Sequence, residues 1–337
     1  MIPFPKGGLA LAPMRALTQP PFWRILNRYG APDAYFSEFI RVHEHFNVNE
    51  KEIVTALEAA GTCPLWVQLM GNDPQALRRN VQLLEAYPIS GIDFNVGCPV
   101  PKIFKKQAGG GLLRDLPLLR KLLIELRSAC TKPLSIKFRI GFDSADSFDA
   151  ILAILSEVQP DLATLHARTV MDLYRGKPRY EYVTMAAHKL SFPLLANGNI
   201  ETITDIGNIL STTGCHGAMI GRAAVRNPWI FRQWHEHQSN MTITYPTFAE
   251  LYHYLEDLFF EFEWDKKDEL SALGCLKRFT NYIGLAVDEN GTFLQQTRTA
   301  TSLKTFWDAC RTFLQKKGNQ TCSGEPFAHL CAQPNKE

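Results

Sequence analysis

The sequence predicts a (β/α)8 barrel followed by a small all-α bundle. Short apolar runs recur eight times between residues 8 and 222, segments with helical spacing separate several of them, and strand-like runs stop after Trp229. Near-continuous apolar strands separated by helices are typical of a parallel sheet covered on both faces. An open doubly wound sheet is the main competitor, but eight units and the lack of a G-x-G-x-x-G turn after the first run disfavour it.

The eight runs and the segments between them give the expected elements in order. Strands are expected at residues 8–14, 33–39, 64–70, 91–97, 134–140, 162–168, 192–198 and 216–222. Helical spacing of apolar residues appears at 73–87, 115–130 and 202–214. The first of these helices opens with Asp73 before a proline, which is a common start of a helix.

The chain is expected to divide into two domains and a tail. Residues 1–240 are predicted to form the barrel, and residues 245–318 three or four amphipathic helices. The segment 319–337 is rich in Gly, Asn, Gln and Pro, so we expect a flexible tail.

Composition excludes several classes of protein. The 337 residues are 45% apolar and 21% charged, which is ordinary for a globular protein, and the formal net charge is only +2. A surface that binds nucleic acid must therefore be local. The eight cysteines form no C-x-x-C pair, which disfavours a structural metal site. Without a signal peptide or a long apolar span, we expect a cytoplasmic monomer with no membrane or metal partner.

Polar residues recur where the predicted strands end, which is where barrels of this type hold their chemistry. These residues are Glu38, Gln68, Asn95, Cys98, Lys137, Arg139, His166, Arg168, Asn197, Gly221 and Arg222. Lys137 and Arg139 lie two residues apart, as do His166 and Arg168, so each pair shares one face of its strand. A lysine and an arginine inside an apolar strand are costly unless an anion or a strong acceptor pairs with them.

The loops after the seventh and eighth strands suggest a phosphate site. They read ANGNIET and GRAAVRNP, whose small residues permit close approach of backbone N–H groups to an anion, with Arg222 supplying charge.

Each candidate also has a structural interpretation. Cys98 alone reads as a buried structural thiol, but its Gly-Cys-Pro turn beyond a strand favours a functional one. His166 can be a satisfied core histidine, and Gln68 and Asn197 can bond loop backbone.

Several motifs together resemble the tRNA-dihydrouridine synthases. They are LAPM (11–14), VQLMG (67–71), DFNVGCPVPK (93–102), SIKFRIG (135–141), LHART (165–169), NGNI (197–200) and MIGRAA (219–224). Ala167 departs from the glycine that this family usually has. SEFIRV (37–42) and Tyr174-Arg175 look most like the bacterial DusC branch, whereas Lys106 and Ala108-Gly109 look more like DusB.

This resemblance implies FMN at the barrel mouth, re-reduced by NADPH, and reduction of a D-loop uridine of tRNA. Asn95 would hydrogen-bond the uracil and Cys98 would donate the proton to C5 after hydride addition at C6. Arg139 and Arg168 would lie near flavin and substrate. The implied flavin contacts are Pro13, Met14, Gln68, Lys137, His166, Asn197, Gly198, Asn199, Gly221 and Arg222.

The tRNA backbone would be bound by local basic groups, among them Lys105, Lys106, Lys277 and Arg278. Three alternatives stay open at this point. The first is an FMN barrel oxidoreductase acting on a free pyrimidine or a small enone. The second is a phosphate-binding aldolase or isomerase with Lys137 as its Schiff-base lysine. The third is a non-catalytic RNA-binding scaffold.

Overall fold

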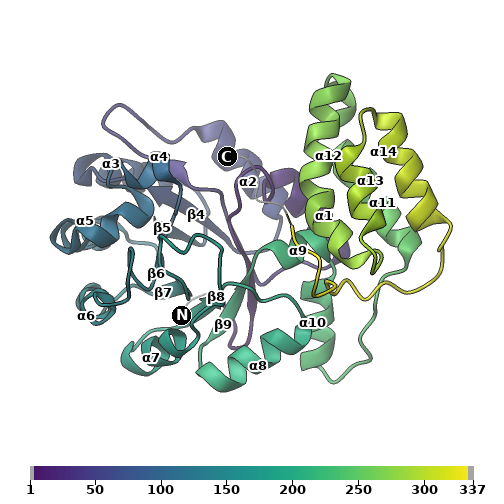
Figure 1. Ribbon diagram of the computed structural model, residues 1–337. Helices are drawn as coiled ribbons and strands as arrows, with labels where there is room; N and C mark the ends of the chain where they lie inside the picture. Colours follow the sequence, from purple (N-terminus) through teal and green to yellow (C-terminus); the bar gives the residue numbers. More distant parts are fainter. Residues whose placement is uncertain (1–3, 333–337) are drawn as a thin grey trace. The chain divides into compact units, whose positions relative to one another are not determined.

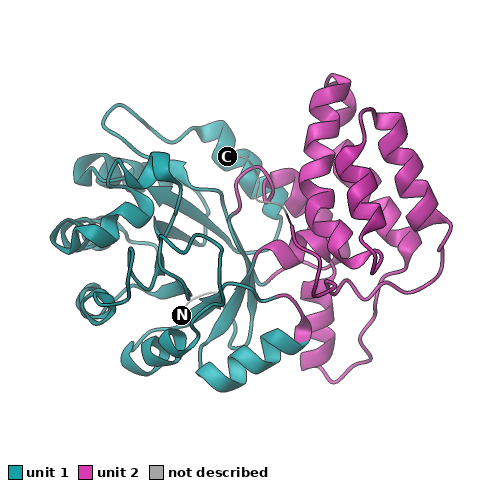
Figure 2. Ribbon diagram, viewed as in Figure 1, with its two compact units in different colours: residues 1–13, 33–200, 204–220 teal, residues 14–32, 201–203, 221–337 magenta. Residues whose placement is uncertain are grey.

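The computed structural model describes residues 4–332, and these form two compact units. The first unit holds residues up to 13, 33–200 and 204–220; the second holds 14–32, 201–203 and 221 onward (Figure 2). The units therefore divide the chain differently from the single boundary expected near residue 240. Helix α1 (Pro20–Tyr29) packs against α11 (Phe248–Glu261), which places an early segment of the chain in the helical unit.

Eight parallel strands close into a barrel in the first unit (Figure 1). The ring runs β1–β2–β4–β5–β6–β7–β8–β9 and closes where β9 pairs with β1. The strands are β1 (Leu9–Leu11), β2 (Ala34–Phe36), β4 (Leu65–Met70), β5 (Gly91–Val96), β6 (Leu134–Arg139), β7 (Leu162–His166), β8 (Leu194–Asn197) and β9 (Gly217–Ile220). A short extra strand, β3 (Ile40–Arg41), pairs with the end of β4. The predicted (β/α)8 barrel is confirmed.

Helices connect the strands and lie around the outside of the barrel (Figure 1). They are α2 (Glu50–Ala60), α3 (Pro74–Leu84), α4 (Pro101–Phe104), α5 (Leu116–Ala129), α6 (Phe148–Val158), α7 (Glu181–Lys189) and α8 (Ile203–Thr213). The Asp73 side chain accepts hydrogen bonds from the first N–H groups of α3, and the Asp115 side chain accepts one from the Leu118 N–H in the first turn of α5. Each cap is followed by a proline in the first turn, so local sequence fixes where both helices begin.

Bulky side chains fill the core of the barrel, and one glycine makes room for them. Trp66 of β4 is fully buried and stacks on Phe36, with ring centroids 5.6 Å apart. Gly91 opens β5 directly beside this indole. A Cβ added there would lie 2.4 Å from two carbon atoms of the Trp66 ring.

The second unit is helical, as expected for the residues after 245. Besides α1 and α11 it contains α9 (Arg222–Arg226), α10 (Ile230–Gln238), α12 (Glu269–Ile283), α13 (Thr292–Thr299) and α14 (Leu303–Cys310). A capping box between Thr247 and Glu250 starts α11. The hydroxyl of the buried Tyr254 donates to the carbonyl of Val225 at 2.9 Å, which fastens α11 to α9.

The described part of the C-terminal tail lies along the helical unit. Thr321 forms an antiparallel bridge with Thr247, and the Arg226 guanidinium donates to the Gly324 carbonyl at 2.8 Å. Residues 333–337 of the predicted tail lie outside the described residues. Flexibility of the tail stays a prediction. Within residues 4–332, no helix is long and apolar enough to cross a lipid bilayer.

The contact between Gly91 and Trp66 predicts a strong asymmetry between two glycine substitutions. Gly91→Ala should lower the free energy of unfolding by about 3 kcal/mol, because the buried indole has no space to move. Gly207→Ala in α8 should raise it by about 0.5–1 kcal/mol, because the added Cβ meets open space and helical glycine is entropically costly. Urea denaturation followed by circular dichroism measures both, and equal effects would contradict this packing.

Candidate active site

Strand register brings the predicted polar residues of the first unit together at the carboxyl ends of neighbouring strands. Asn95 pairs with Lys137, Arg139 pairs with His166, and His166 pairs with Asn197. Gln68 of β4 pairs with Asp93, which lies two residues before Asn95 on β5. Five adjacent strands, β4 to β8, therefore carry these side chains at one end of the barrel.

A hydrogen-bond chain runs from the barrel interior to the Cys98 turn. The backbone N–H groups of Gly97 and Cys98 donate to the Asn95 Oδ1 atom at 3.0 and 2.9 Å. Asn95 Nδ2 donates to Gln68 Oε1 at 2.9 Å, and Gln68 Nε2 donates to Asp93 Oδ2 at 2.6 Å. Backbone N–H groups can only donate, so they assign the oxygen of Asn95 and, through it, the amide orientation of Gln68.

Asp93 is the member of this chain that the sequence interpretation missed. It is fully buried, and burial raises the pKa of its carboxyl to about 6, against the lowering effects of the Gln68 hydrogen bond, the Ser135 hydroxyl and the Lys137 charge. The available signal was its position two residues before Asn95, which places both side chains on one face of β5.

Cys98 lies in a fitted turn and not in a loose loop. Cys98 forms no disulfide with a described residue, is 9% exposed, and packs with Met70, Ile103 and Ala108. Gly109 has a φ of 54°, and a Cβ there would come within 2.9 Å of the Cys98 Cβ. A side chain at position 109 would therefore collide with Cys98, so this turn requires glycine there.

Lys137 is a partly exposed cation held by an amide oxygen. Its Nζ donates to Asn197 Oδ1 at 3.2 Å, and Asn197 Nδ2 donates to the Met219 carbonyl at 2.7 Å. Burial lowers the pKa of Lys137 to about 8, the Arg139 charge adds to this lowering, and Asp93 and Cys98 oppose it. Among the described residues, no carboxylate lies within 4.0 Å of its Nζ.

Two buried arginines hold the loop that follows β7. Arg139 donates to the carbonyls of Thr169 and Leu173, both at 2.7 Å. Arg168 donates to the carbonyls of Arg175 and Gly176, at 3.1 and 2.6 Å. Buried cations were expected to need a strong acceptor, and for both arginines the acceptors are carbonyl groups of this loop. Their direct contact with substrate stays a prediction.

The protonation state of His166 follows from its neighbour. Arg168 Nη1 lies 3.2 Å from His166 Nε2, and a guanidinium can only donate, so Nε2 is an acceptor and the ring proton is on Nδ1. Gly198 packs on this ring: its φ is 116°, and a Cβ would lie 2.9 Å from His166 Cδ2. The Tyr180 hydroxyl donates to the Gly198 carbonyl, an anchor that the sequence interpretation also missed.

An exposed aromatic ring stands beside His166. Tyr174 is 56% exposed, and its ring centroid lies 6.3 Å from that of His166. The Arg139 guanidinium carbon lies 5.6 Å from the same ring centroid, so the loop held by the buried arginines also places this tyrosine.

Three of the predicted flavin contacts belong to the second compact unit. There the Met14 N–H donates to the Thr18 hydroxyl at 2.7 Å, and Gly221 is the N-cap of α9. Arg222, the first residue of α9, lies 3.7 Å from Glu201, which also binds Arg226 at 2.6 Å. In the first unit, Pro13 is half-buried and Asn199 is exposed with a left-handed φ of 45°. The cofactor roles of these residues stay predictions.

The predicted RNA-binding residues differ in their surroundings. Lys105 and Lys106 are exposed just after α4. Lys277 donates to the Ala300 carbonyl at 2.5 Å, and Arg278 donates to the Cys275 sulfur at 2.9 Å. The last two are therefore engaged within the helical unit, whereas the first two point their charges into solvent.

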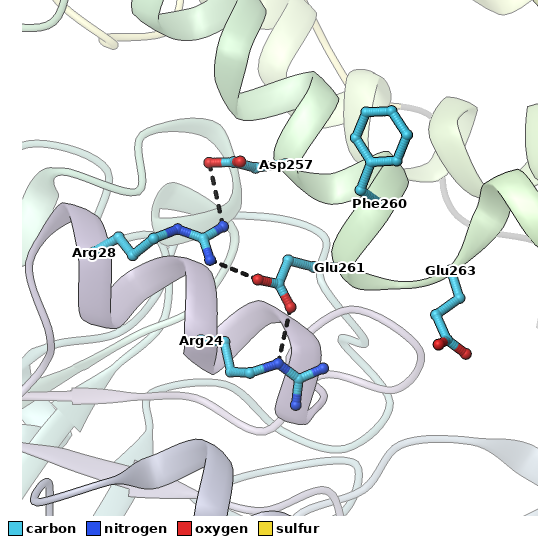
Figure 3. Close-up of a pocket in the computed structure, with 6 residues that line it drawn as sticks. All are labelled: Arg24, Arg28, Asp257, Phe260, Glu261 and Glu263. Atoms are coloured by element: carbon cyan, nitrogen blue, oxygen red, sulfur yellow. Dashed lines mark hydrogen bonds and ion pairs between the residues drawn. The ribbon is translucent and has the colours of Figure 1, made fainter.

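A surface cavity of about 350 Å³ lies in the helical unit between α1 and α11 (Figure 3). Arg24 and Arg28 bind Glu261 at 2.8 and 2.5 Å, and Arg28 also binds Asp257 at 3.3 Å. Glu263 also lines the cavity but pairs with Lys266, so the two guanidinium groups are matched by Asp257 and Glu261, and the cavity offers no surplus positive charge to a polyanion. Its ion pairs join the two helices. Across residues 4–332, no cluster of three or more His, Cys, Asp or Glu side chains could hold a metal ion.

The chain matches one family along most of its length. A family model described as dihydrouridine synthase (Dus) matches residues 10–310. A protein of Pseudomonas syringae named tRNA-dihydrouridine synthase B is 34% identical over 232 residues, which is 67% of each chain. A protein of the same name from Pseudomonas aeruginosa is 34% identical over 67% of this chain and 68% of its own. A probable tRNA-dihydrouridine synthase of Aquifex aeolicus is 31% identical over 69% of this chain and 74% of its own.

These names favour the B branch over the C branch that SEFIRV and the Tyr174-Arg175 pair suggested. The Lys106 and Ala108-Gly109 positions agree with the B branch.

The lowered pKa of Lys137 predicts a pH-dependent stability in protein without a bound ligand. The folded pKa of about 8 lies below the ordinary 10.5, so the protonated lysine costs stability below pH 8, and this cost disappears as pH rises toward 10.5. Lys137→Met should therefore stabilise the protein more at pH 7 than at pH 9.5, by about 1–2 kcal/mol after allowance for partial exposure. Urea denaturation at both pH values measures this difference. The surface variant Lys189→Met is the control, and a pH-independent difference for Lys137→Met would contradict the shift.

Proposed function

Because the chain belongs to the dihydrouridine synthase family, we propose that it reduces a specific D-loop uridine of tRNA to 5,6-dihydrouridine. The observation that carries this proposal is the turn after β5, in which Asn95 holds the backbone of Cys98 at the mouth of the barrel. That turn places an acidic hydrogen beside an amide donor, which is what reduction of a conjugated double bond requires.

The barrel mouth fits FMN. Lys137 supplies a positive charge with no carboxylate partner among the described residues, and His166 supplies an Nδ1 proton. Gly198 leaves no room for a side chain against that imidazole, as a close-fitting planar ligand requires. The residues that would hold FMN are Pro13, Met14, Gln68, Lys137, His166, Asn197, Gly198, Asn199, Gly221 and Arg222. The chemistry that FMN supplies when bound is hydride transfer to uracil C6, after its own reduction by NADPH.

Cys98 supplies the proton in this proposal. Hydride addition at C6 leaves negative charge on C5 and the conjugated C4 carbonyl, and the thiol proton of Cys98 quenches it at C5. An ordinary thiol, with a pKa of about 8.5, is protonated at pH 7 and still gives up its proton readily. Solvent then reprotonates the thiolate, so that NADPH and one proton are consumed per dihydrouridine.

Asn95 holds the base through a donor alone. The two lone pairs of its Oδ1 already accept the N–H groups of Gly97 and Cys98, and one Nδ2 proton goes to Gln68. The remaining Nδ2 proton is available to a uracil carbonyl. The hydrogen bond that Asn95 is expected to make with the uracil is therefore one in which Asn95 donates.

The substrate must present a base that has left the RNA fold, because C5 and C6 cannot be reached in a stack. Exposed Lys105 and Lys106 follow the catalytic turn and would bind phosphates next to the extracted base. Arg139 and Arg168 would contribute to substrate binding indirectly, because they hold the loop that carries Tyr174. Lys277 and Arg278 would contribute to tRNA binding from the helical unit. We further propose that the protein acts as a cytoplasmic monomer.

The purified protein tests this proposal directly. It should be yellow, with an absorbance maximum at about 450 nm. With unmodified tRNA it should oxidise NADPH and add two hydrogen atoms to one uridine. Free uridine should not turn over. Reduction of free uridine or a small enone, with none of tRNA, would support the alternative oxidoreductase function. A colourless protein that forms a borohydride-trapped adduct at Lys137 would support an aldolase.

Cys98→Ala should keep the bound flavin and its reduction by NADPH, because the thiol serves only proton transfer. Dihydrouridine formation on unmodified tRNA should fall by at least about 100-fold. Rapid-mixing absorbance and mass spectrometry of the tRNA measure the two steps separately. Cys215→Ala, which removes another buried thiol, is the matched control. Product formation by Cys98→Ala at the wild-type rate would remove the proton-donor role.

A further inference from the structure

A carboxyl group lies in the barrel interior where the fold itself has no need of it. Asp93 is fully buried, its Oδ2 accepts from Gln68, and its Oδ1 makes no hydrogen bond within 3.5 Å to any described residue. Buried carboxyl groups are costly, and barrel interiors are usually filled by branched apolar residues. We therefore look for the role of Asp93 in its hydrogen bond with Gln68.

Gln68 has two amide orientations of nearly equal shape, and only one suits Asn95. In the observed orientation its oxygen accepts from Asn95 and its nitrogen donates to Asp93. After a flip, the nitrogen of Gln68 would face the nitrogen of Asn95, and donor would oppose donor. Asn95 could relieve this only by flipping too, which would turn its own nitrogen against the N–H groups of Gly97 and Cys98.

We propose that Asp93 is a positioning residue: as the acceptor at the inner end of this chain, it fixes the amides of Gln68 and Asn95 and thereby the turn that carries Cys98. The backbone N–H groups fix the polarity of the chain at its outer end, and Asp93 fixes it at the inner end. This inference rests on the proposed function, because the orientation of the turn matters to catalysis only if Cys98 acts on the substrate.

The role needs an acceptor oxygen and not a negative charge. An asparagine at position 93 can still present an oxygen to Gln68, whereas a leucine of similar size cannot. The charge of Lys137 lowers the pKa of Asp93, but Lys137 makes no hydrogen bond to this carboxyl. A role through charge alone would make the asparagine and leucine variants equally defective.

Four variants of the full-length protein separate these cases. Asp93→Leu removes the acceptor, Asp93→Asn retains it, and Gln68→Met interrupts the chain at its centre. Thr164→Val is the matched control: Thr164 is buried in β7, two strands away from β5, and its hydroxyl makes no hydrogen bond within 3.5 Å to a described residue. The first readout is alkylation of Cys98 by iodoacetamide, resolved by peptide mass spectrometry, with buried Cys215 as the internal reference. The second is the separation of kcat from KM on unmodified tRNA.

Asp93→Leu should raise the alkylation rate of Cys98 by at least about fivefold, with Cys215 unchanged, because the turn opens locally. It should lower kcat by at least about tenfold while KM stays within about twofold. Asp93→Asn and Thr164→Val should stay within about twofold of wild type in both readouts. Gln68→Met should raise Cys98 alkylation as Asp93→Leu does, and it decides the matter if Asp93→Leu does not fold.

Three results would overturn the inference: unchanged Cys98 alkylation in Asp93→Leu or Gln68→Met, a parallel rise at Cys215, or an Asp93→Asn variant as defective as Asp93→Leu. Alkylation needs no substrate. If wild type leaves tRNA unreduced while the alkylation pattern holds, the proposed function fails and the positioning of the turn stands.

Discussion

The site depends on two backbone hydrogen bonds, from the N–H groups of Gly97 and Cys98 to the side-chain oxygen of Asn95. Their direction cannot reverse, because an amide N–H only donates. They set the orientation of Asn95, and through it that of Gln68, so an amide proton and a thiol are presented together. Gly109 and Gly110 press on the same turn, and Gly110 donates to the Cys98 carbonyl at 3.0 Å. The backbone of Cys98 is therefore fixed at its N–H by Asn95 and at its carbonyl by Gly110.

The cations at the mouth of the barrel also differ in the partners that hold them. Arg139 and Arg168 are buried and donate to carbonyls of the loop after β7, while Lys137 keeps an ammonium with no carboxylate of the described residues within 4.0 Å. Burial lowers the pKa of Arg139 to about 10 and that of Lys137 to about 8, so only the lysine approaches neutrality near physiological pH. Lys137 and Arg139 of β6 and Arg168, just after β7, thus have separate roles: the two arginines hold a loop, and the lysine faces the proposed ligand.

Much of this architecture could be predicted from the sequence because it is local. The eight apolar runs gave the eight strands, and Asp73 and Asp115 marked where two helices begin. Strand ends were placed too far along the chain at Arg168 and Arg222, since polar residues that follow a strand still read as its continuation. The placement of α1 in the helical unit, the loop carbonyls that bind Arg139, and the acceptor role of Asp93 all depend on residues far apart in sequence. Periodicity carries no information on such contacts.

The central claim is that Asn95 and Cys98 act as one unit on the base. A double-variant cycle with Asn95→Ala and Cys98→Ser tests it most directly, using single-turnover rates of dihydrouridine formation with tRNA fully bound. If the two act as a unit, the double variant will be within about threefold of the slower single variant, because once the acid is lost its positioning no longer matters. Losses that multiply in the double variant would contradict the account.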